Sequence, residues 1–291
     1  KGSQGPVSAI DYDVKALMTT AAGFAPEVTR TGRIVEFAQR PIQVTDLLPS
    51  TTTSQAAIKY MEETTSTSGA AEIAEAGTYA ESTFVFTEQT SNVRKIGTIL
   101  PVTDEQLEDE AYVEGFVDNR LGFFLAQRLD GQIVVGNGTS PNLRGLLNVV
   151  GIQTQPKGAD PGPDAAYKAM VKVRVTGRAT PSAFIYHPTN WQDIRLLKTA
   201  DGIYIWGSPS EAVPDRIWGL PVAQSDAITL GTAATGDFPG FSELAVRRGV
   251  EVKISDSHST YFAEGKQAIR ADMRAAVVFY RPAAFCTVTG L

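Results

Sequence analysis

The alternation of apolar and polar residues predicts a long two-stranded hairpin in the first third of the chain. Residues 56–63 alternate, and residues 82–100 are rich in Thr, Val, Ile and Phe, as expected of β-strands. The segment between them is small and polar, and it is much longer than an ordinary hairpin loop of about two to five residues. Because an isolated two-stranded ribbon is marginally stable in water, we expect this hairpin to pack against a partner surface.

The pattern then changes to a helical period and predicts one long helix over 104–135. Thr103 and Gln106 have the spacing of a capping box, and acidic residues crowd the first turns, where the helix dipole favours negative charge. At about 1.5 Å per residue the helix would be roughly 45 Å long. The apolar positions that recur at near-helical spacing are Leu107, Val113, Val117, Leu121, Phe124 and Ile133.

The segments before the hairpin and after the helix have other patterns. Residues 1–50 mix β-branched residues with prolines, show no clear helical period and are predicted to form an extended arm. A Pro- and Gly-rich linker at 153–165 precedes alternating helix and strand signals. The predicted elements are a helix near 164–176, a strand at 182–187, a helix at 189–198, strands at 202–206 and 220–224, and further strands over 249–291. We infer two domains and expect the C-terminal strands to return to the domain of the long helix.

The stretch GNGTSPNLRGLL at 136–147 raises the question of a phosphate-binding loop. Such loops follow a strand and precede a helix, whose N-terminus points free amide groups at the anion. Here the glycines follow a helix, whose C-terminal dipole end repels phosphate, and no Gly-Lys-Ser/Thr stands at the required spacing. Gly136, Asn137 and Gly138 are therefore predicted to end the helix. The residues expected to anchor the returning chain are Leu143, Leu146 and Leu147.

Candidate catalytic residues are few. His187 precedes Pro188 at a predicted helix start, where we expect it to satisfy a hydrogen bond rather than to act in catalysis. Asp256, His258 and Ser259 are adjacent in sequence, whereas triad residues are usually far apart in sequence, and no nucleophile elbow is present. A polar turn is the favoured interpretation, and a hydrolase that uses these three residues is the alternative. We therefore expect neither an enzyme nor a cofactor.

Metal binding is not predicted either. The two histidines and the single cysteine, Cys286, do not form a close set of ligands, and Cys286 is expected to be a small buried hydrophobe. The glutamates around the hairpin tip are expected to form a solvated face, and the alternative is that they attract a cation or arginines of a neighbour. They are Glu62, Glu63, Glu72 and Glu75. The tryptophans are expected to be core or interface anchors: Trp191, Trp206 and Trp218.

Composition and charge point toward assembly. A chain of 291 residues with 43% hydrophobic residues can bury a sizeable core, and a net charge of -6 argues against wrapping nucleic acid. No apolar run reaches the length of a membrane span, no signal peptide is recognised, and one cysteine allows no internal disulfide, so cytoplasmic assembly is expected. A large chain with extended appendages and almost no catalytic candidates is predicted to bind other subunits through large interfaces.

Several stretches together resemble the major capsid proteins of tailed bacteriophages, which have the Hong Kong 97 fold. In order along most of the chain they are RPIQVTDLLPS, TFVFTEQTSNVRKIGTILPVTDEQLED, VDNRLGFFLAQRLDGQIVVGNGTSPNLRGLL, HPTNWQDIRLLKTADGIYIWG, IWGLPV and VVFYRPAAF. The resemblance implies an α+β fold. Its expected parts are an N-terminal arm at 1–50, an extended loop at 51–95, a peripheral domain at 96–153 with a spine helix at 104–135, an axial domain at 154–248, and a return to the peripheral domain at 249–291.

The same resemblance implies a structural protein that assembles into hexamers and pentamers around double-stranded DNA in a virion. Portal, scaffold, prohead protease and decoration proteins are the implied partners, and processing by such a protease would fit a chain that does not begin with Met. An encapsulin-like shell that encloses enzymes is the alternative with the same fold. The candidate inter-subunit contacts are Arg40, Asp46, Glu63, Glu72, Glu75, Tyr79, Arg120 and Arg128.

Some members of the family join their subunits by an isopeptide bond. A lysine near the tip of the extended loop reacts with an asparagine of a neighbour, and a buried glutamate promotes the reaction. The matching positions here are Tyr79, Gly265 and Asp272. Because both reacting groups are missing, the resemblance implies a non-covalent shell that is held by the overlap of arm and loop or by a cementing protein.

Overall fold

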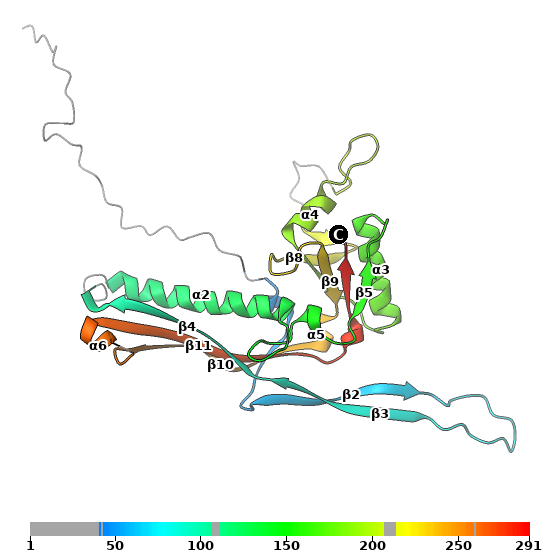
Figure 1. Cartoon of the computed structure of the whole chain (residues 1–291). Coiled ribbons are helices and arrows are strands. Elements are labelled where there is room, and N and C mark those ends of the chain that lie inside the picture. The colour runs from blue at the N-terminus through cyan, green and yellow to red at the C-terminus, as the bar shows by residue number, and fades with distance from the viewer. Residues whose placement is uncertain (1–40, 42, 106–110, 207–213, 259) are drawn as a thin grey trace, which may run out of the picture. The chain divides into compact units, whose positions relative to one another are not determined.

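The computed structural model describes residues 41, 43–105, 111–206, 214–258 and 260–291 (Figure 1). The chain divides into two units between Gln39 and Arg40, and all the described residues belong to the second unit. Most of the expected arm at 1–50, Arg40 included, therefore lies outside the described residues. The part that is described begins with the short 3-10 helix η1 (Thr45–Leu47).

The predicted hairpin is present, but its second strand is shorter than expected. Strand β2 (Ala57–Thr67) pairs antiparallel with β3 (Thr83–Asn92), with a register shift between Glu63 and Thr65. The rest of the predicted strand at 82–100 is a separate strand, β4 (Arg94–Thr103), which belongs to another sheet. The chain changes sheets at the buried Val93, whose N–H donates to the carbonyl of Ala56. The apolar alternation continues through both strands, so the pattern did not reveal the change.

A four-stranded sheet follows the order β1 (Ser50–Thr52), β10 (Ser242–Ser255), β11 (Lys266–Phe279) and β4. Strand β1 pairs parallel with β10, and the other two pairings are antiparallel. Helix α2 (Ala111–Val135) packs on one face of this sheet (Figure 1). The short helix α6 (Tyr261–Glu264) connects β10 to β11. This sheet and α2 share the core with the second sheet.

The long helix is confirmed over the described residues, and it ends at Val135 as predicted. Gln106 and Leu107 lie outside the described residues, as does the side chain of Val113. The buried positions of α2 recur every four residues at Val117, Leu121, Leu125, Leu129 and Ile133.

Phe124 shares the near-helical spacing but lies outside this buried row, because the four-residue spacing of the buried positions directs Leu125 toward the sheet instead. Phe124 is 39% exposed, and the guanidinium of Arg120 lies over its ring, 5.2 Å from the centroid. The ring is therefore held by a cation–π contact on the outer side of the helix rather than by the core.

A six-stranded sheet follows the order β5 (Gln153–Pro156), β12 (Phe285–Thr289), β9 (Thr232–Gly236), β6 (Ala183–Tyr186), β8 (Leu220–Gln224) and β7 (Arg216–Ile217). Three helices lie between its strands along the chain: α3 (Gly162–Val175), α4 (Pro188–Arg195) and α5 (Phe238–Phe241). The predicted strand at 202–206 is absent, since only an isolated bridge between Lys198 and Tyr204 forms there. All four residues of β6 are buried, which fits its central position.

The C-terminal strands do not stay together. Strand β11 joins the sheet under α2 as expected, whereas β12 lies between β5 and β9 in the six-stranded sheet. Pro282 begins the 3-10 helix η3 (Pro282–Ala284) and redirects the chain between the two strands. Phe285 then packs on Phe238 and Phe279 with ring centroids 5.5 and 5.4 Å apart. The expected return of the whole of 249–291 to the first sheet thus differs from the observed topology.

Candidate assembly surfaces

The base of the hairpin is fixed to the end of β11. The hydroxyl of Tyr60 donates to the carbonyl oxygen of Phe279 at 3.1 Å, and the hydroxyl of Ser91 donates to that of Val277 at 2.7 Å. The ring of Tyr60 also packs edge-on against Tyr280, with centroids 5.1 Å apart. Burial raises the pKa of Tyr60, Glu62 raises it further and Arg144 opposes them, so the phenol stays protonated as the donor.

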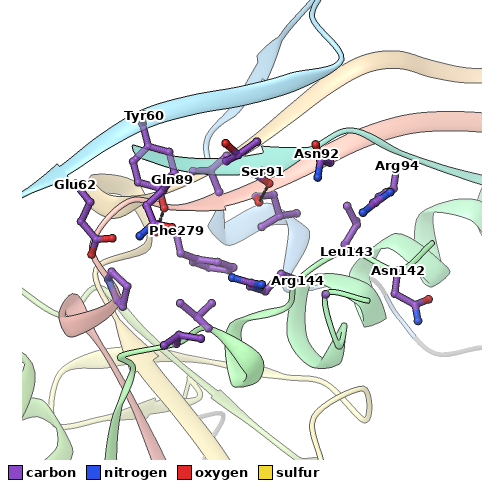
Figure 2. A pocket seen from close by; sticks show the side chains of 17 residues that line it. Tyr60, Glu62, Gln89, Ser91, Asn92, Arg94, Asn142, Leu143, Arg144 and Phe279 are labelled. Atoms are coloured by element: carbon purple, nitrogen blue, oxygen red, sulfur yellow. Dashed lines mark hydrogen bonds between the residues drawn. The ribbon is translucent and has the colours of Figure 1, made fainter. Parts of the chain in front are cut away.

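A polar cavity of about 340 Å³ lies at this junction (Figure 2). Its walls come from the hairpin base, the end of β11 and the loop that follows α2. Arg144 of the GNGTSPNLRGLL stretch lines it together with Arg94, which donates to the hydroxyl of Ser140 at 3.1 Å. The cavity therefore lies between the hairpin and the loop at 136–147 that ends α2, which we call the helix-stop loop.

The outer part of the hairpin leaves apolar and acidic side chains in solvent. Met61, Phe84 and Phe86 are 62%, 57% and 58% exposed, and Tyr79 near the tip is 82% exposed. The register places Glu63 directly opposite Phe86. The other candidate contacts at the tip, Glu72 and Glu75, are also exposed. Such a surface is unusual for an isolated domain and is typical of one that binds another protein.

The helix-stop loop ends the helix as predicted, but Gly136, Asn137 and Gly138 contribute in different ways. Gly138 has the left-handed backbone, at φ +73°, while Asn137 accepts from the Thr139 N–H and from the Asn142 amide. Gly136 allows a close backbone approach, because a Cβ there would lie 2.4 Å from the Leu143 carbonyl oxygen. Of the three anchoring leucines, Leu143 and Leu146 are buried and Leu147 is partly buried against the core.

The aspartate that anchors the segment after the arm was missed from the sequence. Asp130 is fully buried on α2, and its Oδ1 accepts hydrogen bonds from the Val44 and Thr45 N–H groups, each at 3.0 Å, and from the Thr45 hydroxyl at 3.2 Å. Asp46 is exposed in the adjacent turn. The only available signal was an acidic residue directly after Leu129 near the end of an otherwise apolar helix.

Asp272 is buried among cations. The structure pairs it with Lys95 at 3.0 Å, with Arg248, and with Arg270 at 3.5 Å, and its side chain is 3% exposed. Burial opposes ionisation of Asp272, but the hydrogen bond from Lys95 and the charges of Arg248, Lys95 and Arg270 outweigh it and hold the pKa below its ordinary value. The carboxylate is thus charged and occupied by ion pairs.

The other two crosslink positions carry no reacting group. Gly265 is the left-handed C-cap of α6, at φ +60°, directly before β11. Tyr79 lies in the exposed hairpin tip. Of the remaining candidate contacts, Arg128 is exposed and Arg120 is partly exposed on α2. The structure places Gly265 directly before β11 and Asp272 within it, but it leaves the contact candidates spread over different elements.

The two histidines considered for catalysis make structural contacts. His187 caps α4 by accepting from the Thr189 N–H at 3.2 Å, as predicted. His258 packs edge-on against Tyr261, and Ser259 lies outside the described residues. Cys286 is fully buried, and burial raises the pKa of its thiol to about 11, with Lys172 opposing. Within the described ranges no group of three or more His, Cys, Asp or Glu is placed to hold a metal ion.

The tryptophans of the six-stranded sheet region differ in exposure. Trp191 is buried and donates to Asp215 at 3.0 Å, and Trp206 packs beside it, partly buried, at a centroid distance of 6.3 Å. Trp218 is 48% exposed and donates to the Pro163 carbonyl at 2.8 Å. The core expectation therefore fits Trp191 and Trp206 but not Trp218.

Comparison with known proteins identifies one family. Residues 23–290 match the phage capsid family. The major capsid protein of Enterobacteria phage HK97 is 30% identical over 286 residues, which are 97% of this chain and 74% of that protein. A capsid chain of a native GTA particle has the same fold, with a TM-score of 0.78 and 19% identity over 94% of this chain and 99% of that one. A chain of Mycobacterium phage Bobi gives a TM-score of 0.74 and 17% identity over 92% and 96%.

These relatives confirm the α+β Hong Kong 97 fold and the expectation of a structural protein rather than an enzyme. No helix among the described residues is long and apolar enough to cross a membrane. The resemblance implied a long helix and an extended loop, and the structure contains the helix α2 and the hairpin of β2 and β3. The chain belongs to the phage capsid family, as a virion protein of the major capsid type.

Proposed function

We propose that copies of this chain assemble as hexamers and pentamers into a closed icosahedral shell around double-stranded DNA. The observation that carries the proposal is membership of the phage capsid family over residues 23–290. The exposed apolar side chains of the hairpin support it, since Phe84 and Phe86 need a partner surface. A net charge of -6 suits a container that must not grip its contents.

We further propose that the shell is non-covalent. Tyr79 has no amine and Gly265 has no side chain, so the isopeptide bond of some family members cannot form at these positions. Asp272 would have no reaction to promote, and its carboxylate serves Lys95 and Arg248 instead. The shell is then stabilised by the overlap of arm and hairpin or by a decoration protein.

Electron microscopy of the purified protein tests the assembly. Closed icosahedral particles that contain double-stranded DNA are expected from infected cells, and portal, scaffold, protease or decoration proteins should copurify with them. Particles that hold cargo protein and no DNA would instead indicate an encapsulin-like shell. Denaturing gel electrophoresis of boiled particles tests the second proposal, for which a single band of monomers is expected and a ladder of linked subunits would refute it.

The contact candidates on the hairpin and on α2 remain proposed contacts. Reversing the charge of Arg128 on α2, for example, should reduce the yield of particles without lowering the stability of the unassembled chain. Arg128 is exposed, and substitutions of exposed residues usually change the free energy of unfolding by less than about 0.5 kcal/mol.

A further inference from the structure

The cavity at the base of the hairpin has charges that its own side chains do not neutralise. Its charged lining residues are Glu62, Arg94 and Arg144, so two cations and one anion give it a net charge of +1. Its volume of about 340 Å³ lies near the lower end of the range of about 300–1,000 Å³ that is typical of small-ligand sites. The cavity therefore has the size and the charge of a site for a small anion.

Arg144 and Glu62 border the same part of the cavity without bonding to each other. Among the residues that the structure describes, neither side chain has a hydrogen-bond or ion-pair partner. Burial raises the pKa of Tyr60 most, the Glu62 carboxylate raises it further and the Arg144 guanidinium lowers it, so both charges act on one phenol. Figure 2 shows the three side chains around the cavity. The space beside this phenol is thus bordered by an unpaired cation and an unpaired anion.

The helix-stop loop positions Arg144. The loop is held by the bridge between Asn137 and Arg144 and by the Gly138 N–H, which donates to the Leu143 carbonyl oxygen at 2.8 Å. The Arg144 side chain lies over Gly138, where an added Cβ would be 3.0 Å from the Arg144 Nε. Glycine at position 138 therefore leaves the space that the arginine side chain occupies.

The nearby end of α2 does not cancel this cation. The carbonyl oxygens of Val135 and Gly136 both accept from the side-chain amide of Asn148, at 3.1 Å each. The negative end of the helix dipole is therefore partly neutralised within the loop. The helix-stop loop has no helix N-terminus with which to bind phosphate, as predicted, but it supplies a guanidinium instead.

The donors and acceptors of the cavity select among anions. A guanidinium binds phosphate through charge-assisted hydrogen bonds that are often bidentate. An ionised carboxylate only accepts hydrogen bonds, so Glu62 repels an anion that has no proton to donate. Inorganic phosphate keeps a P–OH group near neutral pH, whereas sulfate and phosphodiesters carry no proton there. The pair of Arg144 and Glu62 thus favours inorganic phosphate over both.

We propose that the cavity binds inorganic phosphate, independently of how copies of the chain assemble. Arg144 donates to the phosphate oxygens, and Glu62 accepts from the P–OH group. Arg94 donates to the hydroxyl of Ser140 through one nitrogen and keeps its other N–H groups for the ligand. The amide of Gln89, directly opposite Tyr60, lines the same cavity and adds a neutral donor.

Bound phosphate would join elements that the cavity separates. Glu62 belongs to β2, Arg94 begins β4 and Arg144 lies in the helix-stop loop. The ligand would therefore fix the base of the hairpin to the end of α2. Because Glu62 requires a proton on the anion, the same site excludes the phosphodiester backbone of DNA.

Equilibrium dialysis of radiolabelled phosphate against the full unassembled chain at neutral pH measures the binding. Saturable binding of one phosphate per chain is expected. At equal ionic strength, sulfate and dimethyl phosphate should compete about tenfold more weakly than unlabelled phosphate, or more weakly still, since neither can donate to Glu62. A chain that binds no phosphate, or equal competition by the three anions, would overturn the inference.

Substitutions then assign the residues. Arg144→Gln should weaken phosphate binding by about tenfold or more, and Arg144→Lys should weaken it less, because lysine keeps the charge but not the planar fork. The matched control is Arg174→Gln, an exposed arginine of α3 outside the cavity, which should bind phosphate like the unaltered chain. Glu62→Gln should let sulfate compete as well as phosphate, because its amide can donate to an anion without a proton.

Circular dichroism of each variant controls for folding. The fold should be retained in every one, because the substituted side chains have no hydrogen-bond or ion-pair partner among the described residues. Folded Arg144→Gln that binds phosphate like the unaltered chain, or folded Glu62→Gln that still rejects sulfate, would overturn the inference. Neither result would bear on the proposed assembly, which electron microscopy tests separately.

Discussion

Replacing Asp130 by alanine should destabilise the unassembled chain by about 3 kcal/mol. Its Oδ1 accepts three hydrogen bonds, of which the one from the Val44 N–H is fully buried and those from Thr45 are partly buried. A buried donor that loses its acceptor costs about 1–3 kcal/mol, and a hydrogen bond to a charged group contributes about 1.5–3 kcal/mol. Because Thr45 is partly exposed, water can replace Asp130 there. The expected loss in the free energy of unfolding is therefore the cost of leaving the Val44 N–H unpaired plus a part of the contribution of the two Thr45 hydrogen bonds.

Urea unfolding of the unassembled chain measures this loss, with circular dichroism as the signal. Asp130→Asn keeps an oxygen acceptor at the same place and should lose about 1 kcal/mol. Asp46→Ala, in the adjacent exposed turn, should change the free energy of unfolding by less than about 0.5 kcal/mol. If Asp130→Ala lost less than about 1 kcal/mol, or no more than Asp46→Ala, the carboxylate would not be the anchor of residues 44–45.

Three further predictions use the same unfolding measurement. Leu125→Ala should cost about 2–5 kcal/mol because Leu125 is 2% exposed, whereas Phe124→Ala should cost less because that ring is 39% exposed, and equal losses would contradict the helix orientation. Gly136→Ala should cost more than about 2 kcal/mol, since its Cβ would lie 2.4 Å from a backbone oxygen, while Gly249→Ala meets nothing within 4 Å and serves as the matched control. The pKa of Asp272 is lowered in the folded chain, so its ion pairs stabilise the fold above the unfolded pKa of about 3.8, and this contribution is lost as the pH falls through the folded pKa. Asp272→Asn should therefore reduce the stability at pH 7 and flatten its dependence on pH in the acid range, and an unchanged pH profile would contradict the assignment.

Local patterns in the sequence were sufficient for the elements whose signals are strong. The helix α2 ends at Val135 because Gly136 and Gly138 follow it, and the histidine before Pro188 caps α4. The hairpin also follows from alternation. Each of these signals lies within a few residues of the feature that it predicts, so it needs no knowledge of the rest of the fold.

Features that depend on distant pairing could not be read from the pattern. Strands β3 and β4 have one continuous alternation, and their separation at Val93 depends on which strands pair with each of them. The membership of β12 in the second sheet likewise depends on β5 and β9. Asp130 looked like an ordinary polar residue because its partners are the backbone of residues 44 and 45, 85 or more positions away.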